Sequence, residues 1–445
     1  MKRSAHRSRY ITAAALTVAL TATSCGSDTA APGAAADCAP AQGPVELTFW
    51  SWLPGIDKAV AAWNAGNPDI QVRVEITPQG NQGTYGKMFT ALKAGEAPDL
   101  GQVEFDNLPG FRVQQGLRDI AACPGVAEAA PTFVDWTWGQ ASFQGDGVFA
   151  VPQDTGPLAL FYRKDLFERY DIAVPKTWEE YADAARKLKA ADPKVSITHF
   201  PQKDVNWFAG LVWQAGGQWF ALDGDAWTVN LADPNARKVA DYWQGLVDDD
   251  LVANLQGFSE SWNKALESGT VATWVSAAWG AGTLESAAPS TKGKWAVAPM
   301  PQWTAGEAKS GNWGGSTTAV LAGTEHPAEA AKFALWLNSS PESLAILTSE
   351  GGIYPAAKEA AATLTPSGKL STFFGGQQYY DIFAESSTQV SQDFAWGPAM
   401  EQTYGHIRDG FGTALGGTGT LTDALTTAQQ KTITELERQS IPVRK

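Results

Sequence analysis

The fold of this chain is decided by VELTFW (45–50), IQVRVEI (70–76) and LGQVEF (100–105). The first two stretches alternate apolar and polar residues, as half-buried strands do. Between the three stretches, apolar residues recur at helical spacing, namely Ile56, Val60 and Trp63, then Tyr85, Met88, Phe89 and Leu92. Strand, helix, strand, helix, strand predicts a parallel sheet with helices on its faces.

The rest of the chain continues this α/β pattern. Further strands are predicted at 148–152, 158–162, 271–276 and 294–301, a hairpin arm at 227–229, a helix opened by a capping box at 177–180, helices from 327 and a closing helix at 421–436. Roughly 400 residues are too many for one hydrophobic core, so we expect two lobes.

The first 24 residues have the pattern of an export signal. A basic start is followed by an apolar run, residues 11–20, and by small residues before Cys25. The apolar run is shorter than the roughly 20 residues that span a bilayer. ATSC (22–25) resembles the cleavage box of bacterial lipoproteins, in which the cysteine is lipidated, although Ala22 stands where that family more often has Leu or Val. The alternative is an ordinary secretory signal with an unrelated cysteine.

Residues 25–44 are rich in Thr, Ala, Pro, Gly and Asp, which predicts a flexible linker. Loss of the signal leaves 29 Lys and Arg against 47 Asp and Glu, a net charge near −18. This charge argues against nucleic acid and anionic lipid as partners. Cys38 and Cys123 are then an even pair in an oxidising compartment, so we expect a disulfide rather than two unrelated thiols.

Catalytic and metal-binding motifs are scarce. The four His are scattered, and the chain contains neither a GxSxG nucleophile elbow nor a phosphate-binding loop. Asp223 and Asp225 fit a hairpin turn better than a calcium site. We therefore expect no metal and no cofactor. The many carboxylates leave a glycosidase pair open.

Tryptophan is abundant, with 19 residues. An indole ring offers an apolar face and one donor, which suits stacking against a sugar ring. Trp63, Trp178 and Trp336 lie on apolar helix faces and are expected in the core. Trp52, Glu104 and Asp106 follow the first and third strands, and ligands of a doubly wound sheet bind beyond these carboxyl ends.

Eleven stretches in order resemble the extracellular solute-binding proteins of sugar ABC importers, the maltose-binding-like class of family 1. They are LTFWSW (47–52), NPDIQVRVE (67–75), GEAPDL (95–100), GLRDI (116–120), VPQDTGPLALFYRKDLF (151–167), VPKTWEEYADAARKL (174–188), SAAWG (276–280), GKWAVAPMPQW (293–303), GNWGGST (311–317), AAKFALWL (330–337) and FAWGP (394–398). The resemblance implies a type II periplasmic-binding-protein-like fold: two doubly wound α/β lobes with a hinge and a ligand cleft between them.

On this basis the N-terminal lobe is expected at 45–155 and 302–350, and the C-terminal lobe at 156–301 and 351–445. The hinge crossings are expected near 153–158, 299–302 and 351–352. The ligand-binding residues that the resemblance implies are Trp52, Glu104, Asp106, Asp154, Thr155, Trp207, Trp279, Trp313, Gly314, Ser316 and Trp396. Trp207 rests on a looser local match than the others.

The expected function is the substrate-binding component of a carbohydrate ABC importer, which captures a mono- or oligosaccharide and is not an enzyme. The expected partners are the sugar and the permease subunits. The protein is expected as a monomer on the extracellular face of the cell membrane, held there only by lipid on Cys25. Two alternatives remain: a receptor for a polyamine or other cation, which aromatic rings and carboxylates would also suit, and a secreted glycoside hydrolase.

Overall fold

The computed structural model describes residues 38–364 and 372–444 and contains two main sheets. The first has the order β2-β1-β3-β12-β4. Its strands are β1 (Val45–Ser51), β2 (Ile70–Ile76), β3 (Leu100–Glu104), β4 (Ala150–Pro152) and β12 (Ser316–Val320). Strand β1 is parallel to β2 and β3, as predicted, whereas β12 returns late in the chain and runs antiparallel between β3 and β4.

The second main sheet has the order β10-β5-β11, and β5 is antiparallel to both neighbours. Its strands are β5 (Leu158–Arg163), β10 (Thr273–Ala277) and β11 (Trp295–Ala298). Two small sheets accompany it, formed by β6 (Thr198–His199) with β9 (Val252–Ala253) and by the hairpin β7 (Phe220–Asp223) with β8 (Ala226–Val229). The hairpin lies where Trp227 was predicted to form one arm.

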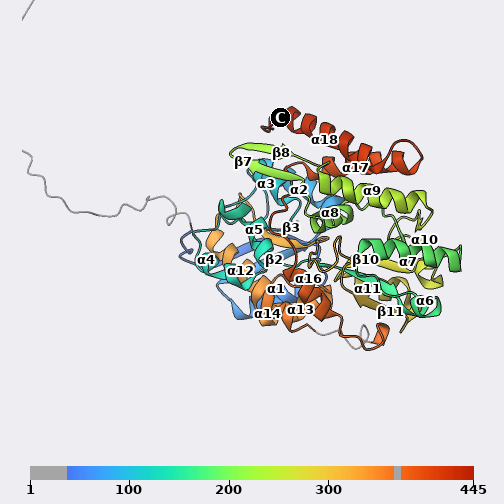
Figure 1. Ribbon diagram of the computed structural model, residues 1–445. Helices are drawn as coiled ribbons and strands as arrows, with labels where there is room; N and C mark the ends of the chain where they lie inside the picture. The colour runs from blue at the N-terminus through green and yellow to red at the C-terminus, as the bar shows by residue number, and fades with distance from the viewer. Residues whose placement is uncertain (1–37, 365–371, 445) are drawn as a thin grey trace, which may run out of the picture.

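Helices cover both sheets (Figure 1). We call the first sheet with its helices the first half of the molecule, and the second sheet with its helices the second half. The helices of the first half are α1 (Ile56–Gly66), α2 (Thr84–Ala94), α3 (Leu108–Val113), α4 (Val126–Ala129), α5 (Asp135–Ala141), α12 (Pro327–Ser339), α13 (Pro341–Gly351) and α14 (Lys358–Ala362). Those of the second are α6 (Lys164–Arg169), α7 (Trp178–Ala191), α8 (Val205–Gln214), α9 (Pro234–Asp248), α10 (Glu260–Ser268), α11 (Gly280–Ala287), α16 (Tyr380–Thr388), α17 (Met400–Leu415) and α18 (Leu421–Arg438). Among the described residues, no helix is both long and apolar enough to cross a membrane.

Local sequence signals explain much of this structure. In β1, Val45, Leu47 and Phe49 are buried, as their alternation predicts. In β2, an edge strand, Val72 is buried but Ile76 is 60% exposed. The predicted capping box of α7 is only half formed. Thr177 accepts a hydrogen bond from the amide of Glu180, but the Glu180 carboxylate bonds to the amide of Lys176, one residue before the cap.

Three segments run side by side between the two sheets. The amide of Gly156 donates to Asn312 Oδ1 (2.7 Å) and the amide of Trp313 donates to the Gly156 carbonyl (2.8 Å). On the other side, the amide of Thr155 donates to the carbonyl of Tyr354 (2.8 Å). A Cβ on Gly156 would lie 1.9 Å from the Trp313 carbonyl oxygen, so only glycine permits this approach.

The second of these segments, residues 311–315, does not lie where we predicted it. We predicted a crossing at 299–302, but Gln302 instead exchanges hydrogen bonds with the backbone at Lys176 and Trp178, where α7 begins. The crossing lies about ten residues later, at 311–315. The glycines there allow the chain to pass close to α8: a Cβ on Gly311 would meet the Gly210 carbonyl oxygen at 1.8 Å.

Both ends of the described chain are fixed to the body. Cys38 and Cys123 form a disulfide with 5.1 Å between their Cα atoms, and both side chains are buried in the cluster beneath the first sheet. At the other end, the backbone of Trp227 in β8 accepts from Arg444 and donates to Pro442. The amino end therefore lies on the first sheet and the carboxyl end on the hairpin β7–β8.

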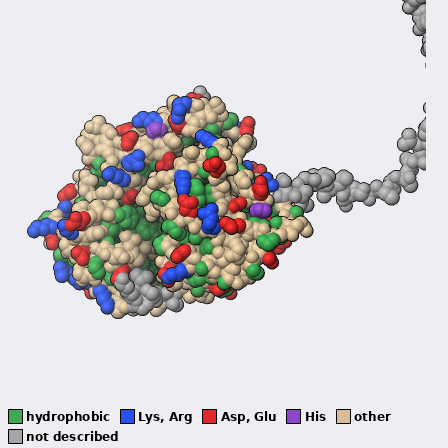
Figure 2. Space-filling model, turned by 180° about the vertical axis from the view of Figure 1, so that it is seen from behind, with side chains coloured by type: hydrophobic (Ala, Val, Ile, Leu, Met, Phe, Trp, Pro, Cys, Tyr) green, Lys and Arg blue, Asp and Glu red, His purple; other side chains and the backbone are tan. Residues whose placement is uncertain are grey.

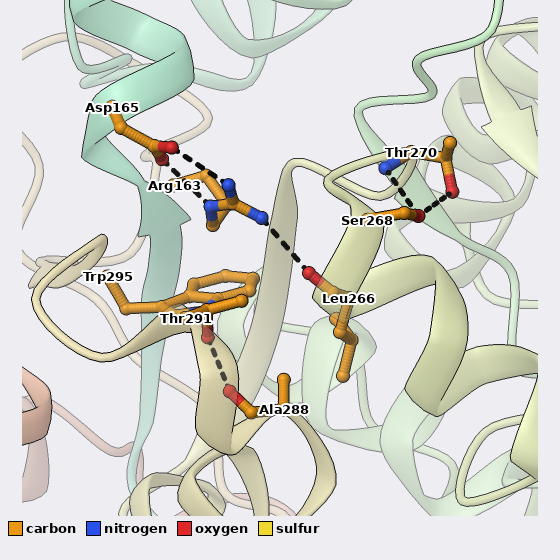
Figure 3. Close-up of polar contacts among 8 residues, drawn as sticks. All are labelled: Arg163, Asp165, Leu266, Ser268, Thr270, Ala288, Thr291 and Trp295. Atoms are coloured by element: carbon orange, nitrogen blue, oxygen red, sulfur yellow. Dashed lines mark hydrogen bonds and ion pairs between the residues drawn. The ribbon is translucent and has the colours of Figure 1, made fainter.

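A buried arginine holds the second sheet to its helices (Figure 3). Arg163, at the end of β5, pairs through two nitrogens with Asp165 (2.8 Å each) and donates to the Leu266 carbonyl at 3.0 Å. Its guanidinium lies 5.9 Å from the centre of the Trp295 ring in β11. Its charge is paired and each of its three nitrogens donates one hydrogen bond, so this buried cation joins β5, α10 and β11.

Candidate ligand-binding cleft

Two acidic residues mark the carboxyl end of β3: Glu104 is the last residue of the strand, and Asp106 lies two residues further on. The Tyr85 hydroxyl donates to Glu104 at 3.0 Å and accepts from the Glu104 amide at 2.9 Å. The Tyr404 hydroxyl, from α17 in the second half, donates to Asp106 at 2.9 Å. Residues about 300 positions apart thus meet at the edge of the first sheet.

A third carboxylate follows β4. Asp154 accepts from the amide of Ser316 at 2.7 Å, and the Ser316 hydroxyl accepts from Gln102 at 3.1 Å. Thr155, next in the chain, is buried, and its hydroxyl has no partner among the described residues. Asp154 and Ser316 therefore lie together at the carboxyl edge of the first sheet, where β3, β4 and β12 meet.

These three carboxylates are in no ion pair within the described part of the chain, and burial raises the pKa of each. For Glu104 the neighbouring charge of Asp106 raises the pKa further. The pKa of Asp154 rises to about 7 through burial, against the opposing effect of its hydrogen bond from Ser316. Burial without a neighbouring protein cation therefore favours the protonated form of each of these groups.

Two glycines, an amide and an indole from the second half close this acidic region. A narrow cavity is lined by Glu104, Phe105, Asp106, Asn206, Gly314, Gly315 and Trp396. Gly314 and Gly315 have φ of 82° and 98°, a conformation that glycine adopts readily. Bare backbone therefore lines the cavity beside the carboxylates. The buried Trp396 indole nitrogen has no hydrogen-bond partner among the described residues.

Aromatic rings continue from this cavity into the second half. Trp279 and Trp313 lie 4.7 Å apart at 67°, and the Trp279 indole donates to the Trp313 carbonyl at 3.2 Å. The Trp313 indole donates to Asn206 Oδ1 at 3.0 Å, so this amide joins the rings to the acidic cavity. On the first half, Trp52 packs edge-on against Tyr85 at 5.8 Å. Trp52 and Trp279 are half-buried, whereas Trp313 is nearly covered.

Figure 2 shows a hollow lined with hydrophobic side chains on the face opposite that of Figure 1. The structure brings ten of the eleven predicted residues to the sheet edge or to the aromatic group, as described above. Trp207 is the exception. Its ring is 2% exposed, packs 5.0 Å from Trp243 and donates to the carbonyl of Val275, so it belongs to the core.

Sequence reasoning missed several polar groups of this region. Asn206, the neighbour of Trp207, is the residue that lines the cavity. Tyr85 was assigned to the apolar face of its helix, and its ring is indeed buried, but its hydroxyl reaches Glu104. Tyr404 and Gln102 carried no sequence signal because their partners are distant in the chain.

Residues 50–342 match the family model of bacterial extracellular solute-binding proteins. The chain belongs to this family. Among its relatives, an arabinooligosaccharide-binding protein of Halalkalibacterium halodurans is 25% identical over 64% of this chain and 65% of its own length. A lactose-binding protein of Rhizobium radiobacter is 27% identical over 79% of this chain and 84% of its own.

Solved structures of solute-binding proteins share the fold. The galacto-N-biose-/lacto-N-biose I-binding protein of the ABC transporter from Bifidobacterium longum, in complex with lacto-N-biose, superposes with a TM-score of 0.80. It is 29% identical, and the match covers 91% of this chain and all of that one. The predicted type II α/β fold and the predicted family are thereby confirmed.

Proposed function

We propose that this solute-binding protein captures an oligosaccharide outside the cell and delivers it to the permease of an ABC importer. The observation that carries the proposal is that aromatic rings and polar groups lie next to one another where the two main sheets meet. The half-buried Trp52 and Trp279 offer apolar faces, while Asn206 and three unpaired carboxylates offer polar groups. Rings that stack on the apolar face of a sugar and polar groups that bind its hydroxyls suit a carbohydrate.

The relatives support the same ligand class, since their names specify arabinooligosaccharide, lactose and lacto-N-biose. They are binding proteins, so we infer capture without catalysis. Neither a cation receptor nor a glycoside hydrolase is favoured by these relatives. Incubation with glycans and analysis of the products would reveal hydrolysis if it occurred.

We further propose that the two sheets mark two lobes that close over the ligand. The lobes would be residues 45–155 with 316–362 and residues 156–315 with 373–444. These limits differ from the initial ones because β12 begins at Ser316 and residues 353–357 bond along Gln153–Thr155. The proposed ligand-binding residues are the ten gathered at the cleft together with Asn206.

The proposed site of attachment to the cell is a lipid on Cys25, which lies outside the described residues. A disulfide between Cys38 and Cys123 agrees with an oxidising location outside the cytoplasm. We propose that the mature protein acts as a monomer on the outer face of the membrane.

A ligand panel tests the proposal. We expect arabinotriose, lactose or lacto-N-biose, at one hundred times its dissociation constant, to stabilise the folded protein by about 2.7 kcal/mol in a thermal-shift assay. Spermidine serves as the comparison compound for a cation receptor. Stabilisation by spermidine and by none of a broad set of mono- and oligosaccharides would refute the carbohydrate proposal.

A further inference from the structure

Phe258 has an unusual conformation for its residue type. It lies in the loop between β9 and α10 with φ of 61°, which bulky side chains rarely adopt. The phenyl side chain is also 50% exposed to solvent. The strained backbone costs stability, and the exposed half of the residue gains none from burial, so stability is a weak reason for phenylalanine at this position.

A comparison with Phe143 supports this point. Phe143 also has a positive φ, of 48°, but its ring is half-buried and packs beneath the guanidinium of Arg112 at 4.4 Å. That contact gives the Phe143 ring a structural role. Phe258 has no cation above it among the described residues, and half of its surface remains free.

Phe258 extends the aromatic group of the cleft. Its ring centre lies 6.2 Å from that of Trp279, with 35° between the planes, and 6.3 Å from that of Trp313. Trp262 and Trp274, at 5.5 and 6.1 Å, support it from the core. The three rings therefore form a compact group in which Phe258 contacts both tryptophans and is the most exposed.

A groove begins where these rings end. It has a volume of about 420 Å³ and lies between the loop of Phe258, the first turn of α10 and one side of α11. Its lining residues are Phe258, Trp262, Asn263, Gly282, Thr283, Ser286 and Ala287. The side chains of Asn263, Thr283 and Ser286 are at least partly exposed and form no hydrogen bond within the described chain. An aromatic surface beside an amide and two hydroxyl groups has the composition of a sugar-binding site.

We propose that this groove is a second saccharide subsite, in which one ring of the ligand stacks on Phe258 and bonds to Asn263, Thr283 and Ser286. This inference rests on the proposed function and specifies its ligand. The solute would be an oligosaccharide with one unit at Trp279 and another in the groove, so a monosaccharide would not use Phe258.

Calorimetric titration of Phe258→Gly tests this inference, with arabinotriose, lactose and lacto-N-biose each measured beside its constituent monosaccharides. Glycine tolerates the positive φ, and this relief of strain opposes the loss of the ring's contacts, so we expect the variant to fold with an unfolding midpoint close to that of the wild type. We expect at least a tenfold loss of affinity for the oligosaccharide that binds, and less than a threefold change for its monosaccharides. Thr283→Val, which removes only the hydroxyl, should show the same selectivity.

Two matched controls accompany these variants. Phe258→Tyr keeps an aromatic ring in the groove and should bind within threefold of the wild type. Gln115→Gly relieves a similar φ, of 55°, at an exposed position on the other half and should leave binding unchanged. Oligosaccharide binding by Phe258→Gly within twofold of the wild type, or equal losses for mono- and oligosaccharides, would overturn the subsite. Failure of the wild type to bind any sugar would overturn the proposed function itself.

Discussion

At the scale of single residues, substitution of Trp279 gives the most direct test of the proposed binding site. Trp279→Ala should weaken oligosaccharide binding by roughly 2–4 kcal/mol, the range of an aromatic hot spot, which is about thirty- to a thousandfold in dissociation constant. The fold should survive because the ring is only half-buried. Trp207→Phe is the control in calorimetry: it should lower the unfolding midpoint and leave affinity unchanged. If Trp207→Phe weakened binding and Trp279→Ala only lowered the unfolding midpoint, Trp207 would be the binding residue and Trp279 the core residue.

Asp154 predicts a dependence of stability on pH. Burial raises its pKa to about 7 in the folded protein, against 3.8 ordinarily. The folded state therefore retains a proton that the unfolded state releases, and the free energy of unfolding should decrease as pH rises from about 4 to about 7. Asp154→Asn keeps an oxygen for the Ser316 amide but cannot ionise, so its unfolding midpoint should vary less over this window. An unchanged pH profile would contradict the shift.

The acidic edge and Trp52 were predictable because topology alone places the ends of β1 and β3 together. The choice between Trp207 and Asn206 was not predictable in the same way. Helix α8 is buried at Val205 and at every position from Trp207 to Gln214, so the sequence contains no polar stripe to show which side faces the cleft. Successive helical residues point about 100° apart, and that rotation decides which of the two lines the cavity.

At the scale of elements, the close approach of the segments that run between the two sheets depends on Gly156. A Cβ there would meet the Trp313 carbonyl oxygen at 1.9 Å and the Ala277 Cβ at 3.1 Å. Gly156→Ala should therefore lower the free energy of unfolding by about 1–3 kcal/mol, as overpacking does. Gly245→Ala, in α9 with no atom near its added Cβ, is the control and should stabilise by up to about 1 kcal/mol. Equal denaturant midpoints for the two variants would show that the segments at Gly156 and Trp313 can move apart without loss of stability.

The disulfide predicts a second effect at this scale. It closes a loop of 85 residues that contains β1, β2 and β3. Replacing Cys38 and Cys123 together by Ala should cost roughly 4–5 kcal/mol in the chain-entropy account. The reduced wild type should match the double variant in chemical denaturation. A variant as stable as the oxidised wild type would indicate that packing alone fixes this end.

The elements that follow strict periodicity were predicted well, and the long-range connections were not. Alternation in 45–50 and 70–76 determined both strands and their parallel pairing. The predicted position of the second crossing was wrong because residues 294–301 read as one continuous strand that led directly into it. What moves the crossing to 311–315 is pairing with Gly156, a residue more than 150 positions away, and no local pattern records that contact.

At the scale of the whole molecule, the proposed lobes imply a change of shape on binding. If the sheets approach each other over an oligosaccharide, the radius of gyration in small-angle X-ray scattering should decrease when saturating ligand is added. Phe258→Gly should need more ligand to reach the same compact state. A radius that stays constant at full saturation would mean that the cleft binds its ligand without closure.

The paths of the two chain ends have a practical consequence. The amino end is held to the first sheet by Cys38–Cys123, and the carboxyl end to the hairpin β7–β8 by Trp227. One end therefore belongs to each proposed lobe. A fluorescent donor fused ahead of residue 38 and an acceptor fused after residue 445 would move with different halves of the protein. Energy transfer between them would then convert sugar concentration into an optical signal.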